Sequence, residues 1–168
     1  MNTQENLINS NRYVSYLFYL LPAMLVTGPF LSNLAVSLIA LYFIFISIKN
    51  QLWVYYKNTF TLIFIVFYFY LLLTSFLSPY SWQAFESSLF YFRFLFFSLC
   101  CFYLISVNSK FLRKFKYFLL ITVLIVTIDG LIQYFLGFNL LGYAYNGSRV
   151  SGFFNEELVL GSFLSRLF

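Results

Sequence analysis

The chain has 168 residues, of which 62% are hydrophobic and 9% charged, with a formal net charge of +5 and a mean hydropathy of +0.85. Soluble globular domains have about a quarter of their residues charged, so this composition excludes that class and indicates an integral membrane protein. The sequence has no His, and its two Cys are adjacent at positions 100 and 101, so it contains neither a zinc nor a haem pattern, and we expect no metal and no cofactor.

The apolar stretches predict helices that cross a membrane. The first apolar region runs from Tyr13 to Ile48 and is interrupted by Thr27-Gly28-Pro29, where Gly and Pro indicate a turn. We therefore predict an all-α fold, a polytopic transmembrane helical bundle with about five complete spans and the start of a sixth. The predicted elements are spans 13–26, 30–48, 59–77, 85–107 and 117–136, then a loop over 137–155 and a helix start over 156–168.

The last predicted helix, 156–168, is too short to cross about 30 Å of hydrocarbon at roughly 1.5 Å per residue. We therefore expect residues 1–168 to form a single transmembrane domain that is truncated, the N-terminal part of a longer protein.

The Lys and Arg residues are distributed unevenly over the segments that connect the predicted spans. Seven of the ten are expected on one side of the membrane: Arg12, Lys49, Lys57, Lys110, Arg113, Lys114 and Lys116. The connections on the other side, 27–29 and 78–84, contain none. The positive-inside rule makes the cation-rich side cytoplasmic. We therefore predict a cytoplasmic N-terminus and a loop 137–155 that faces away from the cytoplasm.

Two ionisable residues fall inside predicted spans. Arg93 and Asp129 lie at matched depths, roughly 10–12 Å from the same membrane face. A charge at mid-helix costs on the order of 2.5–3.5 kcal/mol on insertion scales, so Arg93 should face the bundle or a wet cavity. We predict that Arg93 either forms a structural ion pair with Asp129 or Glu86, or binds an anion through its planar guanidinium. Asp129, which shares a helix face with Gln133, is interpreted as a counter-charge, with proton relay as the alternative.

The loop 137–155 concentrates polar groups beside the membrane. Asn155 is a good N-cap, and Glu156 and Glu157 would follow it in the first turn, so capping alone could explain the two acids. Arg149 and Ser151 have no such local explanation. A cation, a hydroxyl and free backbone N–H groups together make a phosphate-binding edge, with lipid headgroup contact by Arg149 as the alternative.

The basic segment 110–116 is explained by membrane orientation. It is short, lies between two predicted spans and would meet anionic lipid at the cytoplasmic surface. We expect membrane lipids as its partners and no nucleic acid.

The segment Arg149-Val-Ser-Gly-Phe-Phe-Asn-Glu-Glu-Leu-Val-Leu-Gly-Ser-Phe-Leu resembles the Arg-x-Ser-Gly-x-Phe motif of the O-antigen ligase and O-antigen polymerase family, which is followed by an Asn or acidic position and a Gly-bearing helix start. The aromatic-rich spans, the Phe-Leu-Gly-Phe-Asn turn at 135–139 and an Arg in a span also fit that family. The resemblance is loose over the whole chain and most specific over residues 128–165.

The resemblance implies a metal-independent glycosyltransferase of the bacterial inner membrane. Such proteins transfer a glycan from undecaprenyl pyrophosphate, on the periplasmic side, to lipid A core (ligase) or to a growing glycan acceptor (polymerase). The family's pyrophosphate-binding arginines would match Arg149 and Arg93, with Ser151, Asp129 and Glu157 as supporting polar residues. The catalytic residues are not identified, because the family's periplasmic loop with its functional His and Arg would follow this segment. We therefore expect residues 1–168 alone not to catalyse transfer.

Two functions from other classes remain open. Arg93 and Asp129 could line the path of a polytopic transporter or flippase for a lipid-linked saccharide. The chain could also be a non-catalytic membrane scaffold.

Overall fold

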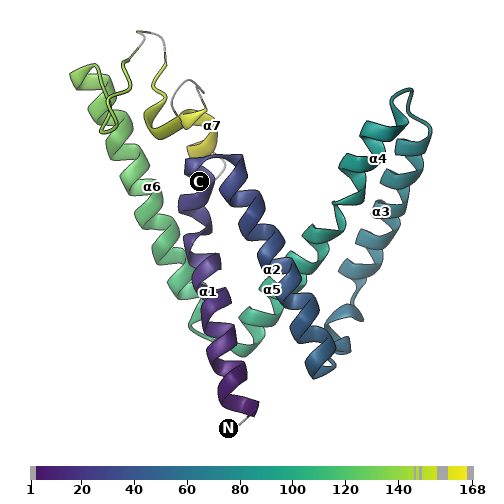
Figure 1. The fold of residues 1–168 in the computed structure, drawn as a ribbon. Coiled ribbons are helices and arrows are strands. Elements are labelled where there is room, and N and C mark those ends of the chain that lie inside the picture. Colours follow the sequence, from purple (N-terminus) through teal and green to yellow (C-terminus); the bar gives the residue numbers. More distant parts are fainter. Residues whose placement is uncertain (1–2, 146, 148, 155–158, 166–168) are drawn as a thin grey trace. The chain divides into compact units, whose positions relative to one another are not determined.

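The computed structural model describes residues 3–145, 147, 149–154 and 159–165, with side chains from residue 11 onward. The described chain is helical, with an isolated antiparallel bridge between Phe138 and Ala144 (Figure 1). The all-α prediction is therefore confirmed. In chain order the helices are α1 (Thr3–Thr27), α2 (Pro29–Asn50), the 3-10 helix η1 (Trp53–Tyr56), α3 (Thr59–Phe76), α4 (Ser81–Leu89), α5 (Phe92–Val107), α6 (Phe111–Leu136), the 3-10 helix η2 (Gly152–Phe154) and α7 (Leu160–Ser165).

Within the described residues, four stretches are long and apolar enough to cross a membrane: Pro29–Asn50, Thr59–Phe76, Ser81–Val107 and Phe111–Leu136. They indicate a multi-pass membrane protein. The predicted span 13–26 is not among them, because it forms the second half of α1, whose first half begins with the polar residues that precede Tyr13. The prediction of about five spans is thus reduced to four candidates.

The helix α3 shows why these stretches are suited to lipid. Most of its 18 residues are apolar, and Leu62, Ile63, Val66, Phe69 and Leu73 each leave more than 60% of their surface exposed. A helix that is hydrophobic all round is stable when its surroundings are apolar too. The side chain of Asn58 caps α3 by accepting the Thr61 N–H at 2.7 Å, which explains the sharp start at residue 59 that the sequence predicted.

The predicted helix 85–107 is interrupted in the structure. It begins earlier, as α4, and breaks at Phe90–Tyr91 before α5. At the break the Arg93 N–H bonds the Phe90 carbonyl, three residues back, and leaves the Leu89 carbonyl without its helical donor. The Tyr68 hydroxyl donates to that carbonyl at 2.9 Å. A side chain of α3 therefore compensates for the break, which periodicity within 85–107 could not reveal.

The other boundaries differ by a few residues. Pro29 occupies the first position of α2, directly after Gly28, whose φ of +123° makes the turn that the sequence predicted.

The helix α6 starts at Phe111, six residues before the predicted 117, so most of the basic segment 110–116 is helical and not a loop. Its long cationic side chains can reach a membrane surface from a helix end.

The chain divides into two compact units: Met1–Val14 with Asn33–Ser109, and Ser15–Ser32 with Lys110–Phe168. In the first unit, α3 and α4 run side by side (Figure 1), with the Ser75 and Ser88 hydroxyl oxygens 2.6 Å apart. Phe43 is fully buried there against the ring of Tyr103, at 6.1 Å between centroids.

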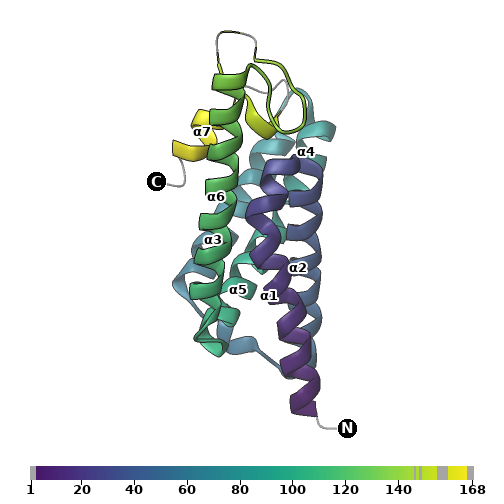
Figure 2. The ribbon, with the colours of Figure 1, turned by 90° about the vertical axis from the view of Figure 1, so that its left-hand side faces the viewer.

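In the second unit, aromatic rings of α1 pack on the start of α6. The Tyr19 ring is parallel to the Phe118 ring at 5.4 Å between centroids, and Phe18 meets Phe111 edge-on at 5.6 Å. At the other end of α6, the chain after Leu136 folds back over the helix end, as both views show (Figures 1 and 2). This arrangement positions the polar loop described next.

Candidate functional site

The polar groups of the second unit are organised around two side chains of α6. Asp129 and Gln133 lie one helical turn apart, on the face that the sequence predicted they would share, and both are fully buried. A buried carboxylate or amide needs hydrogen-bond partners, and here the loop after α6 supplies them.

Gln133 holds the backbone that follows Arg149. Its Oε1 accepts the N–H groups of Ser151 at 2.9 Å and Gly152 at 2.7 Å. Its Nε2 donates to the Ser151 hydroxyl oxygen at 3.1 Å and to the Tyr143 carbonyl at 3.2 Å. Both the oxygen and the nitrogen of the amide form hydrogen bonds, so the loop is fixed to α6 at Tyr143 and again at Ser151 and Gly152.

Asn139 holds the other side of the loop and joins it to Asp129. Its Nδ2 donates to the Gly152 carbonyl at 2.7 Å and to Asp129 Oδ2 at 3.3 Å, while its Oδ1 accepts the Tyr143 N–H at 2.8 Å. Asp129 Oδ1 accepts the Leu140 N–H at 2.9 Å. We call the four side chains of Asp129, Gln133, Asn139 and Ser151 the loop anchor.

Two glycines lie where the loop and α7 meet α6. Gly152 has a φ of +55°, and a Cβ there would lie 3.3 Å from Asp129 Oδ2. Gly130 lies against α7, since a Cβ at Gly130 would come within 2.7 Å of Leu160 Cδ2. These close contacts hold the loop and α7 against the same turn of α6.

The loop anchor presents Arg149 at the surface. The Arg149 side chain is exposed, whereas Ser151, two residues on, is buried with only 4% of its surface exposed. Between them, Val150 packs on an apolar cluster of Val26, Val126 and Leu160. The cation is thus attached to backbone that is fixed on its C-terminal side by both apolar and polar contacts.

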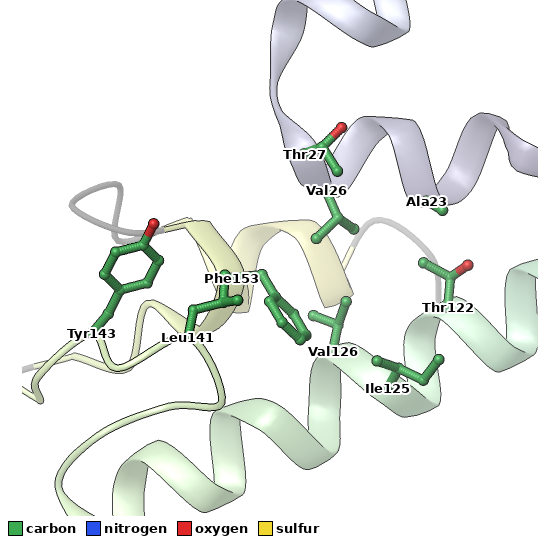
Figure 3. Close-up of a pocket in the computed structure, with 9 residues that line it drawn as sticks. All are labelled: Ala23, Val26, Thr27, Thr122, Ile125, Val126, Leu141, Tyr143 and Phe153. Atoms are coloured by element: carbon green, nitrogen blue, oxygen red, sulfur yellow. The ribbon is translucent and has the colours of Figure 1, made fainter.

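An apolar pocket of about 420 Å³ lies between α1, α6 and this loop (Figure 3). Its walls come from Ala23, Val26 and Thr27 of α1, Thr122, Ile125 and Val126 of α6, and Leu141, Tyr143 and Phe153 of the loop. The two threonine hydroxyls donate to carbonyls of their own helices, at 2.9 Å for Thr27 and 3.0 Å for Thr122. The pocket therefore presents a mainly hydrocarbon surface.

Arg93 lies in the first unit and has neutral partners. Its guanidinium donates from Nη2 to Asn33 Oδ1 at 2.9 Å and from Nη1 to the Ser37 hydroxyl at 3.3 Å, while Nε is buried without a described partner. Within the first unit Arg93 therefore binds amide and hydroxyl oxygens of α2 and not Glu86, and the predicted pair with Asp129, a residue of the second unit, stays a prediction. Neutral partners satisfy hydrogen bonds but leave the positive charge uncompensated.

The predicted site residues thus have different environments. Asp129 and Ser151 belong to the loop anchor, Arg149 is exposed beside it, and Arg93 binds α2. Glu157, like Asn155 and Glu156, lies outside the described residues. The predicted helix 156–168 is described over 159–165, where it is helical from Leu160 to Ser165.

Sequence reasoning missed Asn139, Asn33 and Ser37. Asn33 and Ser37 were detectable in principle, because they are four residues apart on one face of an apolar helix. Asn139 gave a weaker signal, as a polar residue just after Gly137, which ends α6 with a φ of +82°.

No family model, curated protein or solved structure matches this chain.

Proposed function

We propose that this chain belongs to an O-antigen ligase-like membrane protein of the bacterial inner membrane, which transfers a glycan from undecaprenyl pyrophosphate to lipid A core on the periplasmic face. In this proposal Arg149 binds the pyrophosphate, and Arg93 is the second arginine to which the family resemblance gives that role. Ser151 and Asp129 support the site by holding the loop.

The observation that carries the proposal is the fixed attachment of Arg149. An exposed guanidinium on a loop anchored by Gln133 and Asn139 is pre-organised for an anion, and a fixed cation stabilises the negative charge that develops on a departing pyrophosphate. The sequence motif around Arg149 is the part of the chain that most resembles the family. The loop that Gln133 and Asn139 hold is therefore the same segment that carries the motif.

The apolar pocket is compatible with a substrate carried on a lipid. Phe153, four residues after the exposed Arg149, is one of its lining residues, and the pocket is lined mainly by hydrocarbon. A lipid-linked diphosphate combines an anionic group with an apolar chain, so a cation close to an apolar pocket in the same unit matches its chemistry.

The test is Arg149→Ala in the full gene product, expressed in a strain that lacks the resident gene. We expect glycan transfer to fall by about 100-fold or more, the typical effect of removing one group that stabilises transition-state charge. Membrane insertion should be unchanged. Arg113→Ala, which removes a cation from the start of α6, is the matched control and should retain transfer. Normal transfer by Arg149→Ala would exclude this residue from the mechanism.

The same strain separates the alternatives. Loss of a ligase leaves full-length glycan on the lipid carrier, whereas loss of a polymerase leaves single repeat units. Loss of a transporter or flippase leaves the lipid-linked saccharide on the cytoplasmic side. Analysis of the accumulated carrier-linked saccharide therefore assigns the step.

A further inference from the structure

The two tryptophans of the chain lie at opposite ends of α3. Trp53 is the first residue of η1, six residues before α3 begins, and Trp82 is the second residue of α4, six residues after α3 ends. All three elements belong to the first unit. Trp53 leaves 54% of its surface exposed and Trp82 leaves 78%, so neither side chain belongs to the core of that unit.

At the end of α3 the chain turns back and presents apolar side chains outward. The ring of Phe76 packs on that of Phe85, with 4.9 Å between centroids, and holds the start of α4 beside the end of α3 (Figure 1). Leu77, Tyr80 and Trp82 lie in and just after the turn, and each leaves more than 70% of its surface exposed. A cluster of large exposed apolar side chains is typical of a surface that contacts a membrane or another protein.

At the start of α3 the short helix η1 presents Trp53 and Val54 outward, and both are exposed. The next residue, Tyr55, holds η1 to the unit. Its hydroxyl oxygen lies 2.8 Å from the Ser106 hydroxyl oxygen, and its carbonyl accepts Asn58 Nδ2 at 2.7 Å. The outward position of Trp53 is therefore fixed by contacts on both sides of Tyr55.

The distance between the two ends matches the thickness of a membrane. The 18 residues of α3 measure roughly 27 Å at about 1.5 Å per residue, and the hydrocarbon core of a bilayer is about 30 Å thick. The helix α3 contains no charged residue, and the nearest charges, Lys57 and Glu86, lie beyond its two ends. An indole combines an apolar ring with one N–H donor, which favours the boundary between headgroups and hydrocarbon.

We propose that Trp53 and Trp82 lie in the headgroup layers of opposite membrane leaflets, with hydrocarbon around the exposed side chains of α3 between them. The partner of this surface is lipid. The cation distribution, which predicts that the connection 51–58 is cytoplasmic, assigns Trp53 to the cytoplasmic leaflet and Trp82 to the outer one. The inference does not depend on the proposed glycan transfer.

Glu86 is consistent with this placement. It is exposed and lies one helical turn after Trp82 in α4. Side chains of a helix lean toward its N-terminus, so the Glu86 carboxylate extends toward the Trp82 end of α4 and toward the headgroup layer. A carboxylate near the interface avoids the cost of a charge in the hydrocarbon.

The experiment measures the depth of each indole in vesicles by tryptophan fluorescence. The whole chain is reconstituted in phosphatidylcholine and phosphatidylglycerol with acyl chains brominated either near the headgroup or near the terminal methyl group, because bromine quenches an indole close to it. Trp82→Phe leaves Trp53 as the reporter, and Trp53→Phe leaves Trp82. The matched control is Phe67→Trp in a chain with both tryptophans replaced by Phe, since Phe67 is exposed at the centre of α3.

We expect bromine near the headgroup to quench Trp53 and Trp82 the more strongly, at depths of about 15 Å from the bilayer centre, half the hydrocarbon thickness. The reporter at position 67 should be quenched the more strongly by bromine near the terminal methyl group, within about 5 Å, one helical turn, of the centre. The unchanged protein, which reports both indoles together, should show the shallow pattern and provides the reading if a variant does not fold.

Three outcomes would overturn the proposal. If neither bromine position quenches one of the two indoles, water or another protein surrounds it in place of lipid. If Trp53 or Trp82 is quenched as deeply as the reporter at position 67, that indole is not in a headgroup layer. Shallow quenching of all three reporters would mean that α3 lies along the membrane surface and does not connect two leaflets.

Discussion

The side-chain oxygen of Gln133 accepts the backbone N–H of Gly152 at 2.7 Å, although 19 residues separate them in the chain. The same oxygen also accepts the Ser151 N–H. One side chain of α6 therefore accepts two buried backbone N–H groups. These two hydrogen bonds fix the conformation of the loop after Arg149.

Replacing Gln133 with Leu should destabilise the second unit. The change removes the acceptor for two buried N–H groups, each of which costs about 1–3 kcal/mol when left without a partner. We expect the free energy of unfolding in detergent to fall by about 2–4 kcal/mol, because the loop can relax and recover part of the loss. The control is Gln83→Leu on the exposed surface of α4, which should leave stability nearly unchanged. Equal stability of the two variants would show that the loop anchor contributes nothing.

Gly152→Ala should be destabilising for two reasons. The positive φ of 55° is unfavourable for any residue with a Cβ, and the new methyl group would crowd the Asp129 carboxylate. We expect a loss of about 1–3 kcal/mol. Gly161→Ala is the matched control, because a Cβ there meets nothing within 4 Å, and it should be neutral or slightly stabilising. Thermal unfolding of both variants side by side checks this, and a neutral Gly152→Ala would contradict it.

Asn33→Leu should be more damaging to stability than Arg93→Met. The first change leaves a half-buried guanidinium without its closest acceptor, whereas the second removes the charge together with its need for partners. We expect Asn33→Leu to cost about 1–3 kcal/mol and Arg93→Met less. Ser98→Ala, which removes only a bond to a carbonyl of its own helix, is the control on α5. Measured unfolding in detergent with the opposite order would show that the Arg93 contacts are not stabilising.

Cysteine accessibility tests the orientation. In a background with Cys100 and Cys101 replaced by Ser, a membrane-impermeant maleimide should label Arg149→Cys in intact spheroplasts. Lys114→Cys, at the start of α6, should be labelled only after permeabilisation, since the positive-inside rule puts it in the cytoplasm. Labelling in the reverse pattern would place the loop 137–154 on the cytoplasmic side and would remove the basis of the proposed function.

Hydropathy was sufficient to predict the four candidate spans, because each depends on a local property of the chain, but it also predicted a span over 13–26 that is not among them. The start of α3 at residue 59 and the turn at Gly28 follow from a capping Asn and a Gly-Pro pair, both visible in the sequence. The break between α4 and α5 was not predictable in this way. It depends on a hydroxyl from α3 that satisfies the Leu89 carbonyl, and no pattern within 85–107 contains that partner.

The sequence alone determined that the chain is helical, rich in membrane-spanning segments and polar around Arg149, since composition and periodicity act within a few residues. Only the tertiary structure decided what the polar side chains bind. Asp129 accepts amide and backbone donors, and Arg93 donates to neutral oxygens of α2. The physical reason is that a buried charge is stabilised by whichever donors or acceptors the fold brings within hydrogen-bond distance, and matched depth in a membrane does not specify that distance.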